Sequence, residues 1–183
     1  MQLDAGEWLD VGTEIRRRRP LGGVELVYGW APGFREVYPA STFGLAGWGM
    51  PRDLGAGRPL LGLRAAWVPG PGDPPVEEAR FTAWELLGQL GWQWTLGLPD
   101  PDAHVSIGPV VGFGGAHRRI SGSGAESDWP WLLDPTWRLH VAGRRFLLSM
   151  EAGARTIGGG DPSGPEKYLS ASPMFRVGAG ARL

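Results

Sequence analysis

The sequence predicts an all-β fold, a closed antiparallel transmembrane up-and-down β-barrel of about eight strands. Three observations predict it. Apolar side chains alternate with polar or small ones at every second residue over long segments. Apolar residues at helical spacing are missing over comparable lengths. The connections between the alternating segments are short on one side and longer on the other. Residues 1–183 are expected to form a single barrel domain, since the length suits one domain and ten Trp with 42% hydrophobic residues argue against disorder.

The clearest alternation runs over residues 83–98. The even positions are large and apolar, from Trp84 to Leu98, except for Gly88, whereas the odd positions are mostly small or polar and carry one charge, Glu85. Soluble strands are usually about five or six residues long and bury their large side chains. In a transmembrane barrel the apolar face contacts lipid and the other face lines the interior. The length of the segment therefore favours a lipid-facing strand.

The same alternation defines the remaining elements in chain order. The strands are expected near residues 8–16, 22–32, 59–68, 81–98, 103–117, 135–143, 145–157 and 168–181. An even number suits a closed barrel, and closure removes the exposed edges at which so apolar a sheet would aggregate. Nine or ten strands remain as alternatives.

The connections also predict which end faces which compartment. The turns at 99–102 and 143–145 are short, whereas the connections over 69–80, 118–134 and 158–167 are longer. Outer-membrane barrels have short periplasmic turns and longer outside loops, so both chain termini are expected at the periplasmic end. Residues 32–58 do not fit this pattern. They are expected to form a non-barrel excursion on the periplasmic side, with a ninth strand as the alternative.

On this alternation and loop pattern, the whole chain resembles the small eight-stranded bacterial outer-membrane β-barrel proteins. The segment Gly29-Trp30-Ala31-Pro32-Gly33, followed by Tyr38, also resembles a Gly-Trp-x-Pro…Tyr stretch of such barrels. The resemblance implies location in the bacterial outer membrane. Because the N-terminus has no basic region followed by an apolar one, we expect a mature form from which the signal peptide is absent. One departure is the C-terminal Leu183, where such barrels usually end on an aromatic residue.

The inward register predicts a network of charges in the barrel lumen. Its expected members are Asp10, Glu14, Glu25, Arg64, Glu85, Arg138, Glu151, Arg155 and Arg176. An eight-stranded barrel has an interior that side chains just fill, and an unpaired buried charge is costly. We therefore expect these acids and arginines to pair and to keep the barrel closed. The alternative is a gated ion path.

Two groups of residues are candidates for recognition in the outside loops: Arg16, Arg17, Arg18 and Arg19 at the expected tip of the first hairpin, and Trp129 and Trp131 in the connection 118–134. Arginine forks bind phosphate, and Trp suits a membrane interface or a partner. The expected partners are outer-membrane lipid, including lipopolysaccharide, and a protein that contacts the loops or the barrel wall. The net charge of −1 gives no reason to expect nucleic acid.

One pair of residues suggests catalysis. His104 and Ser106 lie two apart on one strand face, like the His-x-Ser pair of the lipid A deacylases, a class of barrel enzymes. However, Ile107-Gly108 follow where that family has Asn-Ala, and no acid faces inward nearby on the next strand. The sequence has no Cys, and no His/Asp/Glu set has metal-ligand spacing. We therefore expect no enzymatic activity, no metal and no cofactor.

The leading functional hypothesis is an integral outer-membrane barrel with a structural or interaction role. One alternative is a narrow channel for ions or small apolar molecules. Another is a soluble lipocalin-like ligand-binding barrel, which would place Leu90, Trp92, Trp94 and Leu96 inside. The soluble alternative is disfavoured because the opposite face of this segment carries a single charge, and soluble surfaces need more.

Overall fold

The computed structural model describes residues 21–31, 40–51, 54, 57–69, 80–97, 103–121, 126–160 and 167–183. The strands are β1 (Leu21–Ala31), β2 (Ala40–Met50), β3 (Arg58–Pro69), β4 (Arg80–Gly97), β5 (His104–Ser121), β6 (Glu126–Asp128), β7 (Trp131–Ala142), β8 (Phe146–Gly160) and β9 (Lys167–Arg182). No helix in this part of the chain is long and apolar enough to cross a membrane.

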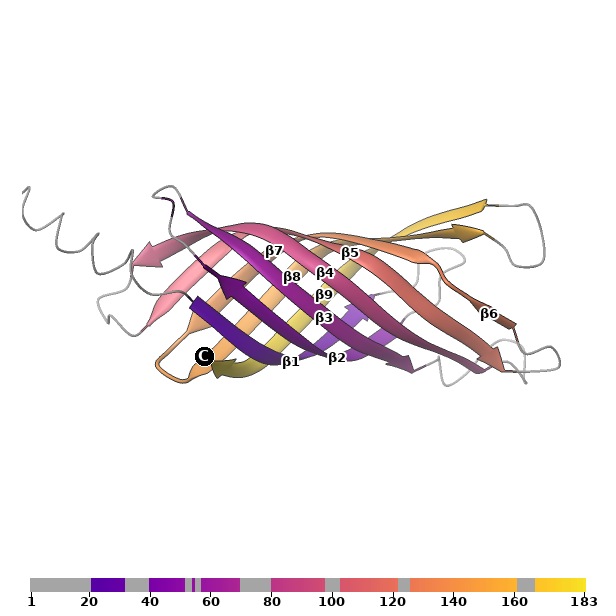
Figure 1. Cartoon of the computed structure of the whole chain (residues 1–183), viewed down its shortest axis with the longest axis horizontal. Helices are drawn as coiled ribbons and strands as arrows, with labels where there is room; N and C mark the ends of the chain where they lie inside the picture. The colour runs from indigo at the N-terminus through magenta and orange to yellow at the C-terminus, as the bar shows by residue number, and fades with distance from the viewer. Residues whose placement is uncertain are drawn as a thin grey trace, which may run out of the picture.

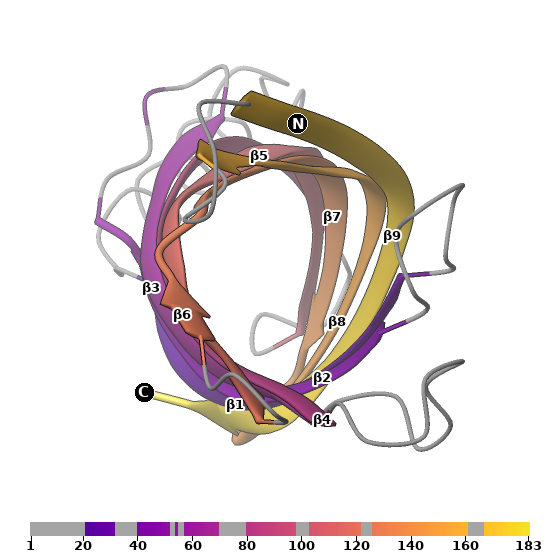
Figure 2. The same cartoon turned by 90° about the vertical axis from the view of Figure 1, so that its right-hand side faces the viewer.

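Eight of the strands close into one antiparallel barrel, as Figure 2 shows from one end. Neighbours along the ring pair in the order β4-β3-β2-β1-β9-β8-β7-β5, and pairing between β4 and β5 closes it. The three-residue strand β6 pairs with β5 at Arg118–Ile120, beyond the stretch of β5 that pairs with β7. The closed antiparallel barrel predicted from the alternation is confirmed.

The prediction for residues 32–58 was wrong, because β2 lies inside that segment and is a complete barrel strand. It pairs with all of β1 on one edge and with β3 on the other. Its alternation is hard to detect because Trp48 and Met50 are large but point inward, whereas the outward positions Gly47 and Gly49 are small. The two faces of this strand therefore look alike in the sequence.

The strand expected over residues 8–16 lies outside the described residues. The ring closes without it, because one edge of β1 pairs with β2 and the other with β9. The barrel strand count is therefore the expected one, with β2 in place of 8–16. Elsewhere the bounds are close to those expected, although β7 begins at Trp131 rather than at residue 135.

The two ends of the barrel differ. We call the end with Leu21 and Leu183 the terminal end; there the Leu183 amide donates a hydrogen bond to the Gly22 carbonyl over 3.0 Å. The shortest connection between strands of the barrel ring, 143–145, lies at this end. At the opposite, distal end, the β8–β9 hairpin and the β5–β6 region extend beyond β1, β2 and β3 (Figure 1).

The outer wall is apolar from strand to strand. Its exposed side chains include Leu26 on β1, Leu63 on β3, Leu90 on β4 and Phe175 on β9, each at least half exposed. Toward the distal end, aromatic rings occupy directly paired positions on five successive strands. This aromatic row comprises Tyr28, Phe43, Trp67, Trp84 and His117, and the His117 ring contacts that of Trp129. Such a row is typical of the membrane–water interface of a transmembrane barrel.

The placement of β2 in the membrane wall can be tested by Leu45→Arg. Leu45 is 52% exposed and lies opposite Leu26 and Ala65. It is the next outward-facing residue on β2 after Phe43 of the aromatic row, toward the terminal end. A lipid-facing arginine costs about 2–4 kcal/mol near the bilayer midplane. Urea titration of the barrel refolded into micelles should show a loss of this order for Leu45→Arg. The matched control is Leu54→Arg, similarly exposed in the connection 51–57, which should cost little; equal effects would contradict the assignment of β2 to the membrane wall.

Candidate functional site: a buried charge network

The barrel interior holds a chain of ionised side chains whose charges alternate in sign. Four acids and four arginines contribute, so the set has no net charge. We call these residues the charge network: Glu25, Arg64, Glu85, Asp134, Arg138, Glu151, Arg155 and Arg176. They come from β1, β3, β4, β7, β8 and β9, and each faces inward because inward and outward positions alternate along a strand. Their side chains are between 0% and 6% exposed.

Glu25 anchors one part of the network. One of its oxygens, Oε1, accepts a hydrogen bond from Arg138 Nη2 over 3.0 Å and another from the Trp48 indole N–H, and its Oε2 accepts one from the Ser149 hydroxyl. Room for this carboxylate comes from Gly178 on β9, since a Cβ atom there would collide with both the Glu25 carboxylate and the Ser149 hydroxyl. The carboxylate is therefore enclosed by partners from β2, β7 and β8.

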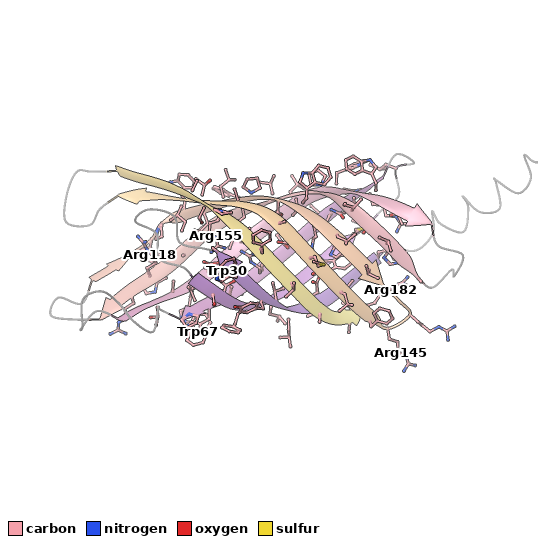
Figure 3. All side chains as sticks on the ribbon, turned by 180° about the vertical axis from the view of Figure 1, so that it is seen from behind. Trp30, Trp67, Arg118, Arg145, Arg155 and Arg182 are labelled. Atoms are coloured by element: carbon pink, nitrogen blue, oxygen red, sulfur yellow. The ribbon has the colours of Figure 1, made fainter. Side chains whose placement is uncertain are left out.

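Asp134 is the centre of the other part. Its carboxylate accepts hydrogen bonds from Arg64 Nη2 over 3.0 Å, from Arg155 over 3.0 and 3.1 Å, and from Arg176. Arg155 also forms a bidentate pair with Glu85, with N···O distances of 2.6 and 2.9 Å. Such planar, two-point arginine–carboxylate pairs are among the strong hydrogen bonds of proteins. Figure 3 shows Arg155 within the barrel.

Glu151 joins the two parts. Its Oε1 lies 3.1 Å from Arg138 Nε, and its Oε2 accepts a hydrogen bond from Arg176 Nη1 over 2.8 Å. The cross-strand register places Glu151 directly opposite both arginines, on β7 and on β9. The network is therefore continuous from Glu25 to Glu85.

Sequence analysis expected seven of these eight residues. The remaining expected members, Asp10 and Glu14, lie outside the described residues. Asp134 was missed because the predicted strand began at residue 135. The inward alternation through Thr136 and Arg138 nevertheless extends back to Asp134, and this was the signal that could have identified it.

Apolar side chains pack inside the barrel on both sides of the network. Toward the terminal end they form a cluster of Leu21, Trp48, Met50, Leu60, Val110, Ala142 and Leu147. Toward the distal end Leu87, Ala116 and Leu132 pack together, with Ile157 against them. The ionised groups thus lie between two apolar layers, where solvent screens them little and pairing is required.

Of the two groups of candidate recognition residues, the structure describes only the tryptophans. Arg16, Arg17, Arg18 and Arg19 lie outside the described residues. Trp129 is 76% exposed and contacts His117, whereas Trp131 is the first residue of β7 and faces outward. Both tryptophans lie at the distal end.

His104 and Ser106 face the interior and are buried, and the structure shows no hydrogen bond on either His104 Nε2 or Ser106 Oγ. Ser106 lies directly across from Thr95 on β4 and His140 on β7. The soluble lipocalin-like alternative is wrong, because Leu90 and Trp94 are on the outer wall, 63% and 43% exposed.

Comparison with solved structures shows the same architecture. The crystal structure of Neisserial surface protein A aligns with 90% of this chain and 96% of that chain, at 11% identity and a TM-score of 0.54. Weaker matches are the attachment invasion locus protein Ail of Yersinia pestis (12% identity, TM-score 0.48, 90% and 97% covered) and the N-terminal β-barrel domain of Pseudomonas aeruginosa OprF (14%, 0.45, 90% and 100%). No protein-family model and no curated protein matches the sequence significantly.

The chain thus has the fold of the small eight-stranded bacterial outer-membrane barrels. It shares with Neisserial surface protein A the closed antiparallel barrel, and at such low identity the likeness concerns the fold alone. The apolar outer wall and the ionised interior agree with a transmembrane barrel on physical grounds.

The importance of Asp134 can be tested by Asp134→Asn. The substitution removes the negative charge that three arginines share, and breaking a buried ion pair on one side typically costs about 3–5 kcal/mol. Urea titration in micelles, followed by the heat-dependent gel mobility of folded barrels, should show a loss of this size. Arg145→Ser, at an exposed position in the 143–145 turn, is the control and should change stability by less than about 0.5 kcal/mol. A loss for Asp134→Asn no larger than for this control would mean that the arginines do not depend on Asp134.

Proposed function

We propose that the protein is a closed outer-membrane barrel with a structural or interaction role, and that its charge network keeps the lumen shut. The observation that carries this proposal is the continuity of the network: ion pairs cross the interior from β1 to β4 through β7, β8 and β9. The barrel then serves as a membrane anchor for the surface at its distal end.

Two physical arguments favour a closed barrel over a narrow channel. An ion that crosses the interior would have to separate arginines from carboxylates that are 0–6% exposed and would leave charges unpaired. It would also have to pass the apolar cluster around Met50 and Leu60 at one end and that around Leu132 at the other. Interiors of eight-stranded barrels are generally just filled by side chains.

The orientation proposed from the sequence has structural support. The terminal end holds the shortest connection between strands of the barrel ring, and the distal end holds the projecting strands β4, β5, β8 and β9. By the asymmetry of outer-membrane barrels, the distal end faces outward and the terminal end faces the periplasm. The aromatic row then lies at the outer interface, next to lipid headgroups, including those of lipopolysaccharide.

Catalysis is not part of the proposal. The one candidate nucleophile singled out from the sequence, Ser106, points into a filled interior and is 0% exposed. A lipid ester at the outer wall therefore cannot reach it. This supports a barrel without enzymatic activity.

Planar-bilayer recording tests whether the lumen is closed. The folded wild-type barrel should give no steady ion conductance, and Asp134→Ala, if it folds, should conduct more because its three arginines lose their shared counter-charge. Steady conductance of the wild-type barrel would overturn the proposal in favour of a narrow channel. A stable but still silent Asp134→Ala barrel would show that the apolar layers alone close it.

Replacing Trp129 and Trp131 with alanine tests the distal surface. These rings contribute amphipathic area at the outer interface, so their loss should weaken binding of the detergent-solubilised barrel to immobilised lipopolysaccharide, with little change in the salt dependence. The control replaces Trp94 and Trp137, which stack on the outer wall with ring centroids 6.1 Å apart. Equal binding by both double variants would show that these two rings make no special contribution at the distal end.

A further inference from the structure

Arginines gather at the terminal end of the barrel, outside the charge network. Arg144 and Arg145 are exposed at the tip of the β7–β8 hairpin, and Arg182 is half-buried at the end of β9. Figure 3 shows Arg145 beyond the ends of the strands and Arg182 at the same end. The residues described at this end include no acidic side chain, whereas at the distal end Glu126 and Asp128 of β6 lie opposite β5. In the part of the chain that the structure describes, the terminal end is therefore positively charged.

Hydrogen bonds hold the tip of this hairpin in place. The Gly143 amide donates to the Phe146 carbonyl over 3.1 Å, so Arg144 and Arg145 alone form the loop. Arg182 secures the tip from β9: its amide donates to the Arg145 carbonyl over 3.1 Å, and its Nη1 donates to the Gly143 carbonyl over 3.3 Å. The two exposed guanidinium groups are therefore presented from one short, braced turn, which we call the arginine turn (Arg144 and Arg145).

The arginine turn borders directly on the lipid-facing wall. Phe146, the residue that follows it, is 55% exposed, and its ring lies against Gly143, where a Cβ atom would collide with it. Leu148, the next outward residue of β8, is 51% exposed. The chain thus passes from cationic to lipid-facing side chains within one residue. Such a boundary marks the level of the lipid headgroups in a transmembrane barrel.

Next to this part of β8, the outward side chains of β9 are short. Ala179 and Ala181 are both exposed on the outer wall, and they lie in paired positions between larger residues of the two neighbouring strands. The larger residues are Phe146 and Leu148 on β8, and Val24 and Leu26 on β1. An extended acyl chain that lies along β9 can therefore approach the backbone between two rows of apolar side chains. Its headgroup end then meets the arginine turn.

We propose that this surface binds one anionic phospholipid of the leaflet at the terminal end, with the phosphate on the arginine turn and one acyl chain along Ala179 and Ala181. Arginine forks bind phosphate oxygens by paired hydrogen bonds, and basic residues at a membrane surface attract anionic lipids. The proposal rests on the orientation given above, under which this leaflet is the periplasmic one. It goes beyond the proposed function, which assigns lipid contacts to the distal end.

Charge complementarity and the continuity of the apolar wall together favour a phospholipid over a soluble anion. A free phosphate or an acidic peptide would bond to the arginine turn but would gain nothing from the wall below it. A phospholipid uses both surfaces, and the bilayer already holds it at the level of the turn. We therefore assign the arginine turn and the adjoining strip of β9 to one lipid molecule.

Native mass spectrometry tests the role of charge. The barrel is released from uncharged micelles that contain equal amounts of phosphatidylglycerol and phosphatidylcholine with the same acyl chains. The wild-type barrel should retain phosphatidylglycerol preferentially, and the preference should fall roughly fivefold to thirtyfold in the double variant Arg144→Gln/Arg145→Gln. The matched control Arg118→Gln/Arg119→Gln removes the same charge at the distal end, opposite the acids of β6, and should keep the preference. No preference in the wild-type barrel, or an equal fall in both double variants, would overturn the proposal.

Ala179→Leu tests the role of the wall, because it fills the strip on β9 without changing any charge. It should lower the retention of phosphatidylglycerol severalfold, whereas Ala65→Leu, at an exposed position on β3, should not. Excess soluble glycerol phosphate should leave the bound lipid in place. Displacement by glycerol phosphate, or equal retention by the two leucine variants, would overturn the proposal.

The wild-type measurement decides even if a variant fails to fold. All of these measurements are made in micelles and do not depend on whether the lumen conducts. A failure of the lipid site is therefore distinguishable from a failure of the closed-barrel proposal, which planar-bilayer recording detects.

Discussion

The pairing of buried charges constrains this barrel more than any other interaction. Asp134 on β7 accepts hydrogen bonds from arginines of β3, β8 and β9, and Glu25 on β1 accepts one from Arg138 of β7. A shift of one residue in the register of any of these strands would turn a charged side chain into the lipid and leave its partner unpaired. The network therefore stabilises the observed strand register relative to registers shifted by one residue, in addition to filling the interior.

The outer wall follows from the same alternation. A strand that directs Arg138 or Glu85 inward must direct Trp137 or Trp84 outward, and the bilayer accepts those side chains while it excludes charges. Ring closure satisfies the backbone groups that lipid cannot bond. The interior is then divided along the barrel axis, with apolar and polar side chains, including the buried Arg58, at the terminal end, the charge network between, and an apolar layer at the distal end.

Alternation made the fold and most of the network predictable from the sequence. Seven network residues follow from period two alone, because the strands that carry them have one large apolar face. The failures occurred where the faces look alike or the pattern is interrupted. On β2 the inward Trp48 and Met50 conceal the alternation, and on β7 Pro135 conceals Asp134. Hydrogen bonding between strands that do not pair, such as that of Arg138 and Ser149 with Glu25, cannot be derived from local pattern, since it depends on how the closed ring brings these strands together.

The most direct test of the network is a double-mutant cycle on Arg155 and Glu85. The single variants Arg155→Met and Glu85→Gln and the double variant would be unfolded with urea in micelles, and the coupling free energy calculated from the three changes in stability. For a buried bidentate pair we expect a coupling of about 1–3 kcal/mol, with the double variant less destabilised than the sum of the single ones. A coupling indistinguishable from zero would contradict the account, because it would mean that the two side chains are hydrated independently and that the interior is not held by its charges.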